Sequence, residues 1–438
     1  MKSTSAITLI AGTLCMNASA WADFVDDGKA VLDLKNFYFN NDMRDATGKT
    51  AEWGQGAVFN YRSGFTEGVV GFGVDAQTML GLRLDGGKGD HKGSSMIPDD
   101  SDGGARHDWS HGGAAAKMKV SNTVLTYGNT LQPNLPILKS NDGRLLPQTY
   151  EGGIITSKEI SDVTLVAGQL EHMVGRGSTN RSGFAVGGPS GKILPQSNQF
   201  RFAGADWKAT PNLLLQYYYA NMEDYYGQHF LGLTHVAPLG ADTSLTSDVR
   251  YFRSSADGAN GTAAGRAEGY RVGGYTHDGS GEIDNRTWSA AFTLKHGGHS
   301  LMVGHQRVSE GSNFVQPNQA NTGEGAGGYS NYLLTDRLIF NFTRAGERTS
   351  FAQYDYNFKQ FGLPGLTAGI SYLSGDHIKN TSDESQEEWE RDLAIDYQVQ
   401  QGALKGVKLG WRNGALRGNA TNDQDQNRLI VSYSIPLF

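Results

Sequence analysis

Lysine and arginine recur on the polar face of segments in which apolar and polar residues alternate. A row of cations along a channel wall selects anions and guides them. Arginine adds specificity, because its planar guanidinium binds a carboxylate through two parallel hydrogen bonds. Their number on one face, rather than any single residue, points to anion binding. The candidate cations are Lys117, Lys119, Arg201, Arg250, Lys295, Lys408, Arg412 and Arg428.

Acidic residues occupy the same polar faces as these cations. If the polar faces line a channel, its wall is therefore not uniformly basic. These carboxylates have two possible roles, which the sequence leaves open: they pair with the arginines, or they bind the ammonium group of a substrate. The acidic candidates are Asp75, Asp248, Asp355, Asp392 and Asp396.

One connecting segment, Asn129–Gln148, is unusual in composition. It contains three prolines and the turn Asn141-Asp142-Gly143-Arg144, yet it is rich in Leu and Ile. It is too apolar for a solvated outer loop and too interrupted by proline for a central strand. We therefore expect it to fold into the lumen as a constriction, with Arg144 as a fixed cation; the alternative is an arginine in a surface turn.

The elements that position these residues are strands. Between Thr287 and Lys295, for example, Trp288, Phe292 and Leu294 share one face, and polar residues occupy the other. Long connections rich in Gly, Asp and Ser, such as 254–284, alternate along the chain with short ones, such as 296–299. An outer-membrane β-barrel has this asymmetry, with tight periplasmic turns and long outer loops. A sandwich has no physical reason to keep its long loops at one end.

Composition excludes several other classes of protein. After the N-terminus no run of about 18 apolar residues occurs, which excludes a helical membrane protein. The 45 aromatic residues (19 Tyr, 19 Phe, 7 Trp) argue against disorder, and the net charge of -7 argues against nucleic-acid binding. Residues 1–22 have the pattern of a secretory signal peptide, which leaves residues 23–438 as one barrel domain.

Motifs of enzymes are missing from the sequence. It has no Gly-x-Ser-x-Gly elbow, no His-Glu-x-x-His pair and no phosphate-binding Gly-x-x-x-x-Gly-Lys-Ser/Thr loop. The pairs His107/His111 and His296/His299 have spacings that suggest metal binding only weakly. We therefore expect no enzymatic activity, no cofactor and no metal site.

Several segments together resemble the OprD-type substrate-specific porins of the outer membranes of pseudomonads and their relatives. The resemblance extends over essentially the whole chain. The segments that carry it are LDLKNFYFNND (32–42), EWGQGAVFNYRSGFTEGVVGFGVDAQTMLGLRLDGG (52–87), NLPILKSNDGRLLPQTYEGG (134–153), DVRYFR (248–253), IDNRTWS (283–289), EWERDLAIDYQVQ (388–400), GVKLGWRN (406–413) and NRLIVSYSIPLF (427–438).

The resemblance implies an all-β fold, an antiparallel transmembrane barrel of eighteen strands. That count replaces the nineteen or twenty candidates that alternation alone gives. It also implies passive diffusion of small carboxylates past a basic constriction. Residue by residue, Arg144 matches the arginine of the inward loop, Arg391 and Arg412 match arginines of late strands, and Arg428 is a further candidate. Gln353 and Ser371 stand where the resemblance leads us to expect basic or strongly polar residues.

Alternative functions stay open at this stage. The family also includes channels for basic amino acids and small peptides, and alternation by itself fits a plugged barrel that binds partners at the cell surface. A hydrolase with a Ser/His pair in the wall has no residues that point to it. For the channel we expect the outer membrane of a Gram-negative bacterium, lipid and lipopolysaccharide as surroundings, and a monomer or a homotrimer.

Overall fold

Long antiparallel strands make up most of the chain. The computed structural model describes residues 26–44, 48–87, 89–91, 96–186, 195–320, 330–382 and 385–438. The predicted signal peptide, residues 1–22, lies outside these ranges. The strands of the barrel wall are β1 (Lys29–Met43), β2 (Lys49–Arg62), β3 (Val70–Asp85), β4 (Asp108–Val120), β5 (Thr123–Leu131), β8 (Thr149–Ser157), β9 (Val163–Val174), β12 (Phe200–Thr210), β13 (Leu213–Met222), β14 (Tyr226–Pro238), β15 (Thr243–Ala256), β16 (Asp284–His296), β17 (His299–Val308), β19 (Arg348–Asn357), β20 (Leu366–Ile378), β21 (Gln386–Gln398), β22 (Lys408–Gly418) and β23 (Gln424–Pro436).

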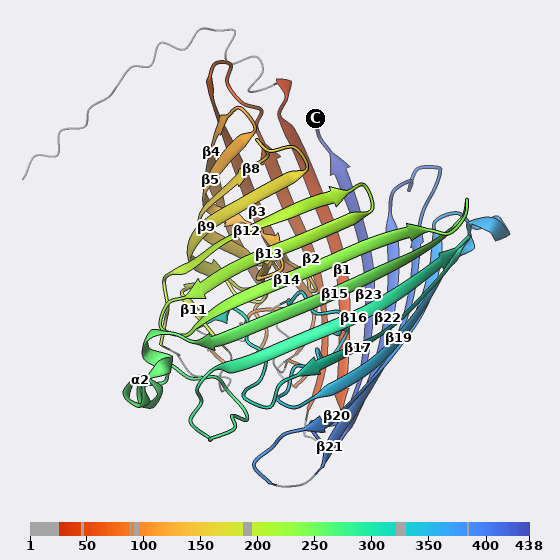
Figure 1. Cartoon of the computed structure of the whole chain (residues 1–438). Coiled ribbons are helices and arrows are strands. Elements are labelled where there is room, and N and C mark those ends of the chain that lie inside the picture. Colours follow the sequence, from red (N-terminus) through yellow and green to blue (C-terminus); the bar gives the residue numbers. More distant parts are fainter. Residues whose placement is uncertain are drawn as a thin grey trace, which may run out of the picture.

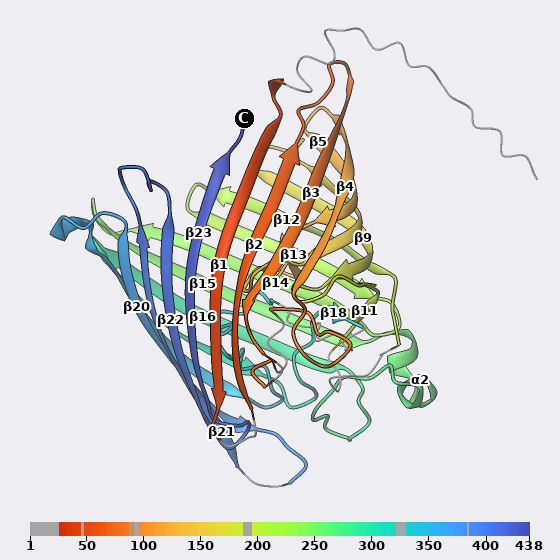
Figure 2. The same cartoon turned by 180° about the vertical axis from the view of Figure 1, so that it is seen from behind.

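These eighteen strands close into a single barrel (Figures 1 and 2). Each strand pairs antiparallel with its neighbour in the chain, and β1 pairs with β23 from Val31↔Pro436 to Met43↔Gln424. Closure leaves no unpaired sheet edge, which is what a sheet needs in order to cross a bilayer. The predicted fold class is confirmed.

The two faces of the wall differ in chemistry. On β16 the side chains of Trp288, Phe292 and Leu294 are exposed on the outside, whereas Thr287 and Ser289 are buried inside. The outward face is therefore apolar where lipid surrounds it, and the polar face points into the lumen.

The longest connections lie at one end of the barrel, as the sequence predicted, although the short connections 223–225 and 419–423 lie at that end too. Residues 121–122, 211–212 and 297–298 are two-residue turns at the end where the C-terminus lies (Figure 1). The opposite end carries the long connections, including 257–283 with η1 (Gly258–Gly261) and α2 (Ala263–Glu268). We assign the short turns to the periplasm and the long loops to the cell exterior.

Small elements complete the chain. A 3-10 turn, η2 (Phe358–Phe361), lies in the periplasmic connection between β19 and β20. Two-residue strands occur inside the long loops: β6 (Asn134–Leu135), β7 (Leu138–Lys139), β10 (Arg181–Ser182), β11 (Phe184–Ala185) and β18 (Asn318–Gln319). In the described part of the chain, no helix has both the length and the apolar composition needed to cross a membrane.

Candidate functional site

The segment 132–148 folds into the lumen because its apolar residues pack on two sides. Ile137 and Leu138 join a cluster with Tyr150 and Phe184, and all four are at most 3% exposed. Leu145 and Leu146 join a second cluster that includes Phe37, Phe39, Met79, Met96 and Trp109. Burial on both sides fixes the polar turn between them across the channel. The sequence predicted an inward constriction at Asn129–Gln148, and in the structure residues 132–148 fold into the lumen.

Hydrogen bonds hold the turn that carries Arg144. The Gly143 amide donates to Asn141 Oδ1 at 2.9 Å, and the Gln148 amide donates to the Asn141 carbonyl at 2.8 Å. Lys35 Nζ, from β1, donates to the Arg144 carbonyl at 3.0 Å. An Asx turn tied to the wall by a lysine is a rigid support for a cation.

A second segment, residues 330–347, also folds inward. Three carboxylates at alternate positions on the lumen face of β21 hold this segment. The Ile339 and Phe340 amides each donate to Glu390 at 2.8 Å. The Leu338 amide donates to Asp392 at 3.4 Å, and Arg344 is ion-paired with Glu388. The segment is the last part of the connection between β17 and β19, which ends at Glu347. The two inward segments meet at a β-bridge between Lys139 and Ser330.

Four guanidinium groups surround one cavity of about 360 Å³ on the exterior side of this constriction. They come from four parts of the chain: the first inward segment, the loop after β9, the second inward segment, and β23. Arg144 and Arg428 both lie over the ring of Phe39, with the guanidinium carbon 4.5 and 5.8 Å from its centroid. We call this space the arginine cavity; its lining residues are Asn141, Gly143, Arg144, Arg176, Ser330, Asp336, Arg337, Leu338, Ile339, Phe340, Asn341 and Arg428.

Two of the four arginines of the cavity, Arg337 and Arg428, are held by neutral oxygens. Arg428 donates to Gln426 at 2.7 Å and to the Leu338 carbonyl, and Arg337 donates to Gln353 at 2.8 Å. Among the described residues, neither arginine has a carboxylate within 4.0 Å. The hydrogen bonds therefore fix the orientation of these two guanidinium groups, while no adjacent carboxylate neutralises their charge.

Three of these guanidiniums, those of Arg144, Arg176 and Arg428, lie close enough to oppose one another's charge. Burial lowers the pKa of Arg176 to about 10. Burial, together with the charges of Arg176 and Arg428, also lowers the pKa of Arg144. Gathering several cations costs free energy that a bound anion would offset.

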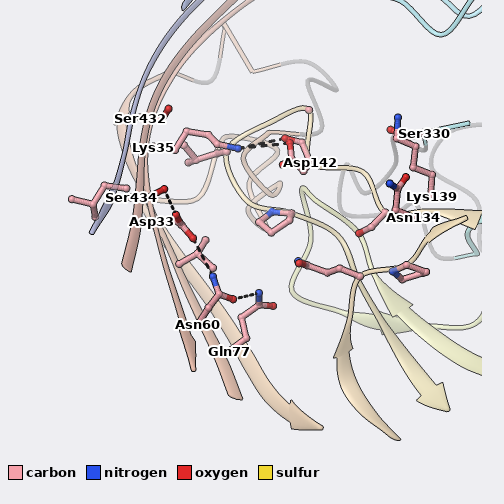
Figure 3. A pocket seen from close by; sticks show the side chains of 18 residues that line it. Asp33, Lys35, Asn60, Gln77, Asn134, Lys139, Asp142, Ser330, Ser432 and Ser434 are labelled. Carbon is pink, nitrogen blue, oxygen red and sulfur yellow. Dashed lines mark hydrogen bonds and ion pairs between the residues drawn. The ribbon is translucent and has the colours of Figure 1, made fainter. Parts of the chain in front are cut away.

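A second cavity, of about 720 Å³, lies on the periplasmic side of the constriction (Figure 3). Lys35 reaches in from β1 towards Asp142, 3.9 Å away, while Lys139 and Ser330 lie on the opposite side. Asp33 accepts hydrogen bonds from Ser434 and from Asn60, and Asn60 accepts one from Gln77. We call this the lysine cavity. It shares Gly143 and Ser330 with the arginine cavity, so the two are consecutive along the pore.

Comparison with known proteins supports this geometry. Residues 22–437 match the family model described as outer membrane porin, OprD family. The chain belongs to the OprD family. It is 36% identical to the porin-like protein GalP of Pseudomonas putida over 98% of this chain and 96% of the relative, and 33% identical to porin D of Pseudomonas aeruginosa over 94% and 92%.

Solved structures agree with the sequence relatives. The crystal structure of Pseudomonas aeruginosa OccK8 (OprE) superposes with a TM-score of 0.88 at 47% identity, covering 95% of this chain and all of the other. OccK9 (OpdG) of the same species gives 0.84 at 37%, covering 94% and 100%. This OprD-family protein is thus a porin of the Gram-negative outer membrane, a channel and not an enzyme.

The porin's other predicted lumen cations fall into two groups. Lys117 and Arg412 are ion-paired with Asp75 and Asp396, at 2.6 and 2.8 Å. Arg250 is likewise paired with Asp248 at 2.7 Å. The first reading of the acidic residues, as partners of basic ones, is confirmed for these three pairs. Exposed lysines line the lumen near its periplasmic end, at positions Lys119, Lys295 and Lys408.

Two predicted lumen residues point the other way. Arg201 lies between the buried Phe200 and Phe202 and shares the outward face with Trp207. Arg391 shares the outward face with Ile395, beside Asn413, whose side chain it contacts. The prediction that they line the lumen is wrong. Strand parity overrides the resemblance for Arg391, and for Arg201 the inward positions are filled by the two phenylalanines.

Some residues around the porin's cavities were missed from the sequence. Arg176 and Arg337 lie in loops, where no alternation shows which way a side chain points. Gln353 and Ser371, the positions where a cation seemed to be lacking, lie on β19 and β20, the fourteenth and fifteenth strands of the wall. Arg337 donates to Gln353, so the second segment brings a cation to that place. Among the described residues, no group of three or more His, Cys, Asp or Glu side chains could hold a metal ion.

Proposed function

We propose that this porin passes small carboxylate-bearing solutes, simple or aromatic, by passive diffusion. The observation that carries the proposal is the arginine cavity, in which Arg144, Arg176, Arg337 and Arg428 surround a space of about 360 Å³. A guanidinium binds a carboxylate in a planar, bidentate manner. OpdK of Pseudomonas aeruginosa, 30% identical to this chain, has a crystal structure with vanillate, an aromatic carboxylate.

The order of the cavities gives a route for the anion. A carboxylate entering from outside meets the arginine cavity, passes between Gly143 and Ser330, and reaches Lys35 and Lys139 in the lysine cavity. Several weak sites in series allow flux, whereas one tight site would block it. The lysines at the periplasmic end then continue the basic surface.

A channel for basic amino acids is the main rival. Such a solute needs carboxylates in the pore to bind its cationic end. Glu388 and Glu390 already hold the second inward segment. Among the residues that line the two cavities, the carboxylates are Asp336 in the arginine cavity and Asp33 and Asp142 in the lysine cavity. The two cavities have more arginines and lysines than carboxylates, and this excess of cations favours the anionic end of a solute.

Single-channel conductance in planar bilayers tests the proposal. The refolded porin is measured in NaCl and then with benzoate, succinate or arginine added. We expect the carboxylates to interrupt or saturate the current, and the double variant Arg337→Gln/Arg428→Gln to weaken this block by about tenfold or more. Arg391→Gln, on the outward face, is the matched control and should leave the block unchanged.

Each other result has a definite meaning. Block by arginine but not by carboxylates would replace the substrate class with basic amino acids. Absence of current from well-folded protein would favour the plugged surface-binding barrel. Equal loss in Arg391→Gln and in the double variant would show that net charge, rather than the cavity, controls the block.

A further inference from the structure

Four neighbouring strands carry an arginine on the outward face, away from the pore. Arg253 on β15, Arg286 on β16 and Arg307 on β17 are exposed, and Arg348 on β19 is half-buried. Each alternates with residues that point into the barrel: Phe252, Thr287, Gln306 and Thr349 are all buried. These strands run side by side across the front of the barrel in Figure 1. We call these residues the outer arginine patch.

The register sets like charges opposite each other. Arg253 is the direct partner of Arg286, and Arg307 is the direct partner of Arg348. Like charges directly opposite on one face of a sheet are destabilising. In the described part of the chain, none of the four has a carboxylate within 4.0 Å. Asp376 is the direct cross-strand partner of Arg348 but is ion-paired with His377, and Asp284 lies on the same outward face as Arg286. An arrangement of this kind is stabilised when an external anion lies between the guanidiniums.

The patch lies at the exterior ends of its strands, where the apolar band ends. On the outward face of β16, Arg286 is followed towards the periplasm by the large, exposed apolar residues Trp288, Phe292 and Leu294. On β17, His305 lies next to Arg307, and the exposed apolar residues Val303 and Leu301 follow it. The arginines are at the strand ends that join the long exterior loops, including the loop with α2. The periplasmic ends of the same outward faces carry His296, His299, Tyr354 and Tyr356 instead.

We propose that the outer arginine patch binds the phosphorylated sugar headgroup of lipopolysaccharide, the glycolipid of the outer leaflet. Its phosphates lie at the level of the bilayer interface on the exterior side, which is the level of the patch. Paired guanidiniums bind phosphate oxygens bidentately. Exposed Trp288, which is the direct register partner of Arg307 and lies two residues from Arg286, is placed to contact the sugar and acyl chains. The site is separate from the pore, because the wall lies between them.

The test measures binding of diphosphorylated lipid A to the folded porin in detergent, by native mass spectrometry. The variant Arg253→Gln/Arg286→Gln/Arg307→Gln should bind it at least tenfold more weakly than the original porin. Arg201→Gln is the matched control, an outward exposed arginine whose register partners are Gln169 and Asn221, and it should change binding by less than twofold. Conductance of each variant reports that the barrel has folded.

Three results would overturn the proposal. Unchanged lipid A binding by the triple variant would show that the patch is not the site. Equal loss in Arg201→Gln would reduce the effect to net charge. Phosphatidylglycerol binding as strongly as lipid A, or millimolar inorganic phosphate displacing lipid A, would show a general anion site. A fully conducting triple variant that has lost lipid A binding supports the proposal.

Discussion

Arg250 and Arg253 lie three residues apart on β15, yet the barrel wall separates them. Arg250 points inward, donates to both oxygens of Asp248 and lies 4.2 Å from the ring centroid of Tyr332. Arg253 points outward and faces Arg286. Inside the barrel, cations are held by carboxylates, amides, carbonyls and rings, whereas in the outer patch Arg253 faces Arg286 and Arg307 faces Arg348.

This difference shows that a count of arginines says little about where anions bind. Inside the pore, firm support lets a cation present its charge to a passing solute without closing on it. In the outer arginine patch, no carboxylate of the described residues lies within 4.0 Å of the four arginines, and a membrane anion is the partner that we propose. The predictions below test that contrast, beginning with the largest expected effect.

Removing the support of the second inward segment should have the largest effect. In Glu390→Leu the Ile339 and Phe340 amides lose their acceptor, and hydrogen bonds contribute about 0.5–1.5 kcal/mol each. We expect segment 330–347 to leave the wall, with conductance rising severalfold and carboxylate block lost. Single-channel recording measures both. Unchanged conductance would mean that the segment does not depend on Glu390.

Within the lumen, a cation without a carboxylate partner should matter more than a paired one. Arg428 and Arg412 are direct cross-strand partners, but only Arg412 is ion-paired, with Asp396. We expect Arg428→Gln to weaken carboxylate block by about tenfold and Arg412→Gln by about twofold. Equal effects would show that the ion pair does not shield Arg412.

Moving the arginine from position 337 in the second inward segment to position 353 in the wall tests whether either position can supply the cation. Arg337 donates to Gln353 on β19. Arg337→Gln should weaken carboxylate block by about fivefold, and adding Gln353→Arg should restore it to within about twofold. Titration of the block in planar bilayers gives both values. Failure of the second substitution to restore it would mean that the cation must come from the loop.

A pH effect is expected in the exterior loop between β3 and β4. His91 contacts Glu52, and its Nε2 lies 2.8 Å from Asp99. Burial alone lowers the pKa of His91, but the two carboxylates raise it more, so it lies above the ordinary value of 6.5. The contact is therefore fully stabilising below pH 6.5 and is lost as pH rises through the raised pKa.

Current recordings can detect this change. Between about pH 6 and about pH 9 we expect the original porin to gain current fluctuations as His91 loses its proton. His91→Gln should fluctuate equally at both pH values. A pH response that persists in His91→Gln would assign the effect to another group.

The smallest effect should come from the outer patch when the pore is measured. The triple variant Arg253→Gln/Arg286→Gln/Arg307→Gln should change carboxylate block by less than about twofold, because the wall and lipid separate the patch from the lumen. A larger change in the same titration would show that the outer charges reach the pore, and the contrast between the faces would fail.

The sequence by itself determined the barrel and its first constriction. Alternation shows which residues share a face, and the apolar flanks of Asn141–Arg144 indicate burial inside the channel; both are local properties. The inward fold of segment 330–347 could not be predicted from such local properties. Its inward course depends on Glu390 and Asp392, more than forty residues away in the chain.

Only the tertiary structure decided which cations meet. Arg144, Arg176, Arg337 and Arg428 come from separate loops and the last strand, and barrel closure brings them around one cavity. Arg391 shows the opposite case, since its outward parity removes it from the pore. Local alternation fixes the face that a strand residue occupies. The direction of a loop side chain depends on contacts that form only when the barrel closes, and this is the physical reason for the division.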